Sequence, residues 1–134
     1  MKKVLLLFAS REGQTRKIAT RIAEHLEEAG LDVDLVDAAD RAATEAIDLE
    51  SYALLVFGAS LHAGGIAGDV KGFVHAHARQ IQPHPKSFFL VSLSAATKDP
   101  EIRGEFLADA RRKLDRQIDV TFEDTEMLAG ALRY

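Results

Sequence analysis

The sequence predicts a three-layer α/β fold in which five parallel strands form one sheet that is covered by helices on both faces. Short continuous apolar runs, typical of strands buried on both faces, alternate with segments whose apolar residues recur at helical spacing. The chain has 134 residues, of which 47% are hydrophobic, enough for one domain with its own core. Strands and helices that alternate in this way are joined by right-handed crossovers, which produce a parallel sheet.

Five segments have the composition of strands. Val4–Phe8 and Ala53–Phe57 are continuous apolar runs, whereas Leu31–Val36 alternates between apolar and polar residues. The other two expected strands are Ser87–Leu93 and Met127–Leu132. Five strands with these connections fit the spatial order 2-1-3-4-5.

Helical segments separate these strands. The expected helices span Gln14–Ala29, Arg41–Ile47, Val70–Ile81 and Pro100–Gln117. Gly30 supplies a stop for the first, and Pro83 ends the third. No helix is expected after the fifth strand, so the predicted fold lacks the last helix of such a sandwich.

Composition excludes several classes of protein. The chain has no cysteine, which removes thiol nucleophiles, cysteine-based zinc sites and redox dithiols. A net charge of −4 argues against nucleic acid as the partner, because a dedicated binder has a basic surface. The apolar run Val4–Phe8 is too short for a signal peptide or a membrane span, so we expect a cytoplasmic protein. No metal site is expected, since His75 and His77 do not share a helix face.

Three loops are expected to meet at the carboxyl edge of the sheet, where such folds bind ligands. Ala9–Thr15, Ala59–Gly68 and Ser92–Lys98 are all rich in small and hydroxyl-bearing residues. The first loop joins a buried strand to a helix N-terminus, whose free N–H groups and dipole favour an anion. An ordinary turn in which a Ser or Thr side chain caps the helix is the alternative for this loop.

Other phosphate-site templates fit less well. The sequence contains no G-x-x-x-x-G-K-S/T motif, and Gly64, Gly65 and Gly68 do not form the dinucleotide fingerprint G-x-G-x-x-G. A phospho-receiver domain would need acidic side chains after its first and third strands, where this chain has Ala9-Ser10 and Gly58-Ala59.

The segment Phe8–Ala19, FASREGQTRKIA, resembles the FMN-phosphate loop of flavodoxins. Over its whole length the chain resembles the flavodoxin-like family of menaquinone-dependent protoporphyrinogen IX dehydrogenases, which act in haem biosynthesis. Further matching segments are Val56–Leu61, Phe73–Ala78, Phe88–Leu93 and Ala129–Tyr134. The resemblance implies a single flavodoxin-like domain over residues 1–134, in which residues 98–125 correspond to the family's insertion before the last strand.

The resemblance also implies FMN as the cofactor, held by three sets of residues. The phosphate would be bound by Ser10, Arg11, Gly13, Gln14 and Thr15. One side of the ring would lie against Ala59, Ser60, Leu61, His62, Ala63 and Gly64. The other side would be flanked by Ser92, Leu93, Ser94, Ala95, Ala96 and Thr97. No general acid or base is expected among them, because the flavin itself carries the redox chemistry.

The implied activity is oxidation of protoporphyrinogen IX, or of another small-molecule reductant, with a quinone as the electron acceptor. The resemblance further implies peripheral contact with the inner face of the cell membrane through residues 98–125, and it leaves an oligomer open. Two other functions stay open: an FMN electron carrier without its own small-molecule substrate, and a flavin-free interaction module. His62 either contacts the flavin or is an exposed loop histidine. Four cations either contact an anionic substrate or lipid surface, or form a solvated helix face: Arg111, Arg112, Lys113 and Arg116.

Overall fold

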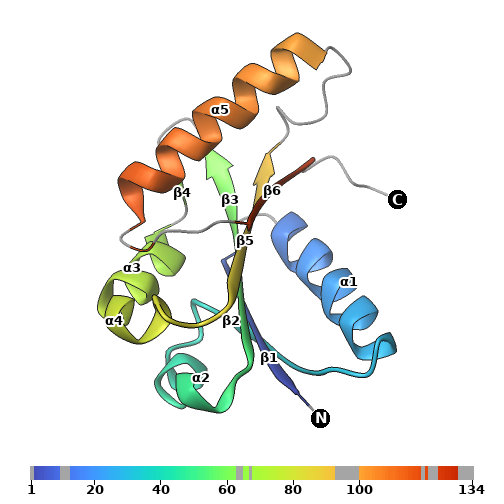
Figure 1. Cartoon of the computed structure of the whole chain (residues 1–134), viewed down its shortest axis with the longest axis vertical. Helices are drawn as coiled ribbons and strands as arrows, with labels where there is room; N and C mark the ends of the chain where they lie inside the picture. Colours follow the sequence, from blue (N-terminus) through green and yellow to red (C-terminus); the bar gives the residue numbers. More distant parts are fainter. Residues whose placement is uncertain are drawn as a thin grey trace.

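The computed structural model describes residues 2–9, 13–62, 65–66, 68–92, 100–118, 120 and 124–129. Five parallel strands form a sheet in the order β2-β1-β3-β5-β6 (Figure 1). They are β1 (Lys3–Ala9), β2 (Asp32–Asp37), β3 (Leu54–His62), β5 (Lys86–Ser92) and β6 (Asp124–Ala129). Counted along the chain, these parallel strands have the order 2-1-3-4-5, which confirms the predicted topology.

A short strand and six helical segments complete the described part of the fold. The two-residue strand β4 (Gly65–Ile66) pairs antiparallel with the end of β3. The helices are α1 (Gln14–Glu28), α2 (Arg41–Glu45), α3 (Gly68–Ala76), α4 (Ala78–Ile81) and α5 (Pro100–Gln117), with a 3₁₀ turn η1 at Leu49–Ser51. In Figure 1, α1 lies on one side of the sheet and α2, α3 and α4 on the other, while α5 extends past the arrowheads of the strands.

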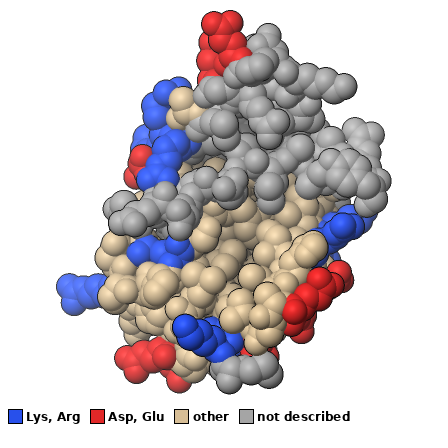
Figure 2. Space-filling model, turned by 45° about the vertical axis from the view of Figure 1, so that its right-hand side comes forward, with Lys and Arg blue, Asp and Glu red and all other residues tan. Residues whose placement is uncertain are grey.

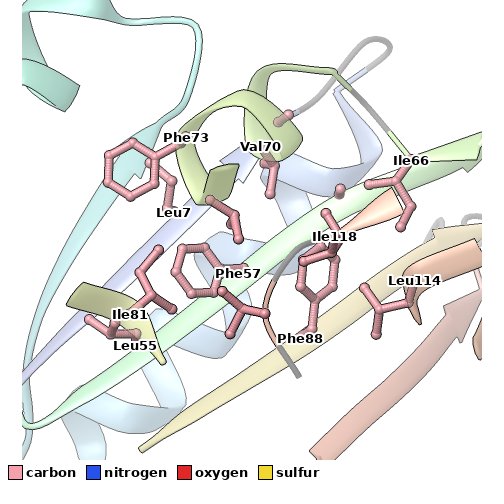
Figure 3. Close-up of a cluster of buried hydrophobic side chains, with 14 of the residues drawn as sticks. Leu7, Leu55, Phe57, Ile66, Val70, Phe73, Ile81, Phe88, Leu114 and Ile118 are labelled. Atoms are coloured by element: carbon pink, nitrogen blue, oxygen red, sulfur yellow. The ribbon is translucent and has the colours of Figure 1, made fainter. Parts of the chain in front are cut away.

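The core consists of two apolar clusters, one on each face of the sheet. Along β1, Leu5 and Leu7 belong to the cluster under α3 and α4, whereas Leu6 and Phe8 belong to the cluster under α1. Because side chains of a strand alternate between faces, burial on both sides requires an unbroken apolar run, as the sequence shows. In the first cluster the Phe57 ring lies 6.3 Å from that of Phe88 (Figure 3).

The third predicted strand was expected to end at Phe57, and that boundary is wrong. β3 continues to His62: Gly58 and Ala59 pair with β1 and β5, and Leu61 and His62 pair with β4. Small residues after Phe57 are typical of a turn, but pairing with strands on both sides keeps them extended. Part of the expected loop Ala59–Gly68 is therefore strand.

The last strand also begins earlier than predicted. β6 spans Asp124–Ala129, in register with Ser87–Ser92, and the predicted Met127–Leu132 overlaps only its second half. The prediction followed apolar residues, whereas an edge strand tolerates the polar residues with which β6 begins. Residues 130–132 lie outside the described part of the chain.

The predicted helix Val70–Ile81 is interrupted. α3 ends at Ala76 and α4 begins at Ala78, with His77 between them at φ −119° and ψ 19°. The His77 ring stacks on Phe73 with centroids 4.3 Å apart, and His77 Nδ1 lies 2.9 Å from the Phe73 carbonyl oxygen. These contacts fix the side chain at a helix break that apolar spacing alone does not predict.

Candidate functional site

The strands that precede the three predicted loops end at one edge of the sheet. Ala9 of β1 pairs with Ala59 of β3, and Ser60 of β3 pairs with Val91 of β5. These three strands are parallel neighbours, so the chain leaves each of them at the same carboxyl edge. This is the position at which open parallel sheets bind ligands.

The first segment at this edge is the N-terminus of α1. Gly13 occupies the N-cap position at φ 85°, a left-handed conformation that glycine adopts without steric cost. No side chain caps the helix there among the described residues, and its first turn carries Arg16 and Lys17 but no acid. Because the dipole makes this end positive, an anion would be stabilised there by the helix.

The first turn of α1 buries one polar side chain and one further polar atom. Thr15 is only 1% exposed, and the Oε1 atom of Gln14 is buried without a hydrogen-bond partner among the described residues. A buried polar atom without a partner costs about 1–3 kcal/mol. A ligand with hydroxyl groups would supply the missing donor, and a rotated amide would instead present its NH₂ to a phosphate. The chemistry of both residues therefore fits the ribityl phosphate of a flavin nucleotide.

Arg16 is anchored beside this helix end, a role that the sequence analysis did not assign. Its Nη2 donates to Asp37 Oδ2 at 2.7 Å, and its guanidinium carbon lies 5.1 Å from the centre of the Phe8 ring. Asp37 Oδ1 also accepts from the Ala39 N–H at 2.9 Å. Arg16 thus ties α1 to the carboxyl ends of β1 and β2. The partners are 8 and 21 residues away in the chain, so local sequence carries no signal for them.

The second predicted segment lies at the end of β3. Ala59 is completely buried in the core cluster with Phe57, so its side chain packs in the core and its backbone remains for ligand contact. Ser60 is half-buried, and Leu61 and His62 are the last residues of the strand. Ala63 and Gly64 lie outside the described residues. The predicted contacts of this segment with a flavin ring stay a prediction.

The third predicted segment begins at Ser92, the last residue of β5. Ser92 is next to both neighbouring strand ends, since β5 pairs with β3 and β6. Leu93, Ser94, Ala95, Ala96 and Thr97 lie outside the described residues, as do Ser10 and Arg11 of the first segment. The structure therefore brings the described starts of all three segments to one edge.

Three cations of α5 are paired with acids of the same helix: Arg111, Arg112 and Lys113. Arg111 Nε lies 3.3 Å from Asp115 Oδ1, and Lys113 Nζ lies 3.0 Å from Asp109 Oδ2. The hydrogen bond from Lys113 lowers the pKa of Asp109 below its usual range. Such i,i+4 pairs support an exposed helix. Contact of these cations with an anionic substrate stays a prediction.

Charge is mixed on the face shown in Figure 2. Basic and acidic side chains lie around its rim, and uncharged residues occupy the middle. The described part of this face has no continuous basic surface of the kind that binds nucleic-acid phosphates. Within the described residues, no three histidine or acidic side chains are grouped to hold a metal ion. None of the helices described is long and apolar enough to cross a membrane.

A family model for the flavodoxin domain matches residues 5–134. The chain belongs to this flavodoxin-domain family. Among curated proteins, it is 34% identical over 132 residues to protoporphyrinogen IX dehydrogenase (quinone) of Escherichia coli K12, a match that covers 98% of this chain and 70% of the relative. Family membership supports a flavin cofactor, in agreement with the chemistry at the N-terminus of α1.

Solved flavodoxins share the fold. Oxidised flavodoxin 1 of Bacillus cereus superposes with a TM-score of 0.58 at 23% identity, covering 96% of this chain and 86% of the flavodoxin. The flavodoxin of Streptococcus pneumoniae TIGR4 gives a TM-score of 0.60 at 18% identity, with 95% and 84% covered. The flavodoxin-like fold expected from the sequence is thereby confirmed.

Proposed function

We propose that this chain is an FMN-dependent oxidoreductase that oxidises protoporphyrinogen IX and passes the electrons to a quinone. The observation that carries the proposal is the 34% identity to a protoporphyrinogen IX dehydrogenase (quinone), because it extends over 98% of the chain. The match therefore includes all three segments of the candidate site, rather than only the strands that any flavodoxin-like protein requires.

In this proposal the N-terminus of α1 binds the phosphate of FMN. The N–H groups of the first turn and the helix dipole supply positive potential, and Gly13 allows the backbone to approach closely. Thr15 adds a hydroxyl donor from a position that water barely reaches. Gln14 would hydrogen-bond to the ribityl chain or the phosphate and so satisfy its buried amide oxygen.

The ends of β3 and β5 would flank the flavin ring. Bound FMN would supply the redox chemistry, accepting hydrogen from the substrate and giving electrons to the quinone. The protein's part is to hold the ring between backbone segments at Ser60 and Ser92 and to leave one edge open to substrate. We further propose peripheral contact with the inner face of the cell membrane, which co-sedimentation with anionic lipid vesicles tests.

The first test is binding of FMN compared with riboflavin, which lacks the phosphate. We expect the apoprotein to bind FMN more tightly than riboflavin. Thr15→Val should weaken FMN binding by about 1.5–3 kcal/mol, the value of a hydrogen bond to a charged acceptor, and should leave riboflavin binding unchanged. Thr20→Val is the matched control, because Thr20 is on the same helix and its hydroxyl donates to the Arg16 carbonyl.

Turnover then separates the enzyme from an electron carrier. The proposal requires FMN-dependent loss of protoporphyrinogen IX when a quinone is added. If the FMN-loaded protein oxidises no porphyrinogen but reduces a protein partner, the chain is a carrier. Equal affinity for FMN and riboflavin in the wild type would show that the phosphate site is misplaced.

A further inference from the structure

The short strand paired with the end of β3 is bonded to a side chain from far along the chain. The N–H of Ile66, in β4, donates to the side-chain Oε1 of Gln117 at 3.0 Å. Ile66 pairs with Leu61, and Gly65 pairs with His62. Gln117 thus bonds to the strand that is paired with the predicted ring-binding segment of β3.

Strand β4 has only two residues and pairs with no strand except β3 in the described sheet. A backbone N–H on the outer edge of such a strand needs an acceptor when water is excluded. Ile66 is 4% exposed, so its surroundings are largely dry. The amide of Gln117 serves as this acceptor, in the place that a carbonyl of another strand would occupy.

Apolar packing places Gln117 where it can do this. Leu114 and Ile118, on either side of Gln117 in the sequence, are buried in the same cluster as Ile66. Figure 3 shows the three apolar side chains near one another, beside Phe88. This packing anchors the last turn of α5. The first part of the helix extends past the strand ends, as Figure 1 shows.

We propose that Gln117 is a positioning residue for the flavin site: by fixing β4, it holds the end of β3 in the conformation that contacts the ring. This inference rests on the proposed function. It makes the last turn of α5 part of the site's support, although Gln117 lies 51 residues from Ile66 in the sequence.

Two substitutions at one position test the inference. Gln117→Leu removes the acceptor with little change in volume, whereas Gln117→Glu keeps an acceptor oxygen at the same distance from the backbone. Gln80→Leu is the control, since Gln80 is exposed on α4 and its substitution makes the same chemical change elsewhere. Amide hydrogen exchange at Ile66 is measured in the apoprotein, and the affinity and visible circular dichroism of bound FMN in the loaded protein.

We expect Gln117→Leu to accelerate exchange at Ile66, to raise the dissociation constant for FMN roughly tenfold and to alter the circular dichroism of the flavin. Gln117→Glu should restore all three values, and Gln80→Leu should match the wild type. Unchanged exchange in Gln117→Leu overturns the inference. Faster exchange with unchanged FMN affinity and spectrum overturns it too, by separating β4 from the site. If the wild type binds no FMN, the proposed function fails. The exchange measurement is made in the apoprotein, so it still tests the contact between Gln117 and β4.

Discussion

At Gly58 the packing leaves no room for a larger side chain. A Cβ atom added there would lie 1.9 Å from Cζ of Phe89 and 2.4 Å from both Cε atoms. The two residues are paired across β3 and β5, so the Phe89 ring covers the backbone of Gly58. Phe89 is 4% exposed, and its ring is packed with Phe8 and Val56 in the cluster under α1.

We therefore expect Gly58→Ala to destabilise the fold. The ring cannot leave the cluster without exposing apolar surface, and the backbone cannot shift without disturbing pairs on both sides of β3. Overpacking of this kind costs about 1–3 kcal/mol. The upper half of that range applies here, because the three atoms nearest to the added methyl all belong to one rigid ring.

Urea denaturation of four variants measures the effect. Gly72→Ala is the matched control, because Gly72 lies inside α3 with nothing within 4 Å of the added Cβ. That change should stabilise the fold by about 0.5–1 kcal/mol. Phe89→Leu should offset part of the cost of Gly58→Ala, so the double variant should be more stable than the sum of the two single changes. A Gly58→Ala protein as stable as the wild type, or strictly additive effects, would refute the reasoning.

Three further predictions concern polar and aromatic contacts. The Tyr52 hydroxyl donates to Asp34 Oδ2 at 2.6 Å. The pKa of Tyr52 is raised well above 10, mainly by burial and to a smaller extent by this bond and by nearby carboxylates. Since the raised pKa belongs to the folded state, the stabilisation is complete below about pH 10 and is lost as the pH rises through the folded pKa. Tyr52→Phe should lose about 1 kcal/mol at pH 7 and show a flatter decline in alkaline urea titrations. If the stability of Tyr52→Phe fell at alkaline pH as steeply as that of the wild type, this reasoning would be contradicted. Gln14→Leu should stabilise the apoprotein by about 1 kcal/mol, because a buried unpaired acceptor disappears, and should weaken FMN binding; a less stable apoprotein would show that the amide has a partner. His77→Ala should lower the unfolding free energy by about 1 kcal/mol through loss of the stack on Phe73, as thermal unfolding measures, whereas the exposed His75→Ala should cost less.

The parts of the fold that follow from local pattern could be predicted from the sequence. The run Val4–Phe8 is buried on both faces, and the start of α1 at Gln14 and the span of α5 agree with the spacing of apolar residues. The order of the strands also follows, because parallel strands joined by helices have few arrangements. For the single elements, the signal lies within one segment of the chain.

The features that were not predicted depend on residues distant in the sequence. Gly58 and Ala59 have the composition of a turn, and only their partners in β1 and β5 keep them in a strand. The contact of Gln117 with Ile66 spans 51 residues, and that of Arg16 with Asp37 spans 21. For the site, the sequence predicted which strand ends converge, but not which neighbouring side chains hold them in place.

The acidic composition of β2 has a consequence for self-association. Among the strands that the structure describes, this one lies at the edge of the sheet beside β1, and it carries Asp32, Asp34 and Asp37 along its six residues. An uncovered strand edge invites another chain to add a strand of its own, which is a common route to aggregation. Asp34 and Asp37 are paired with Lys3 and Arg16, so Asp32 would contribute most of the repulsion against the carboxylates of a second copy. We expect any assembly of this protein to form through surfaces other than the β2 edge.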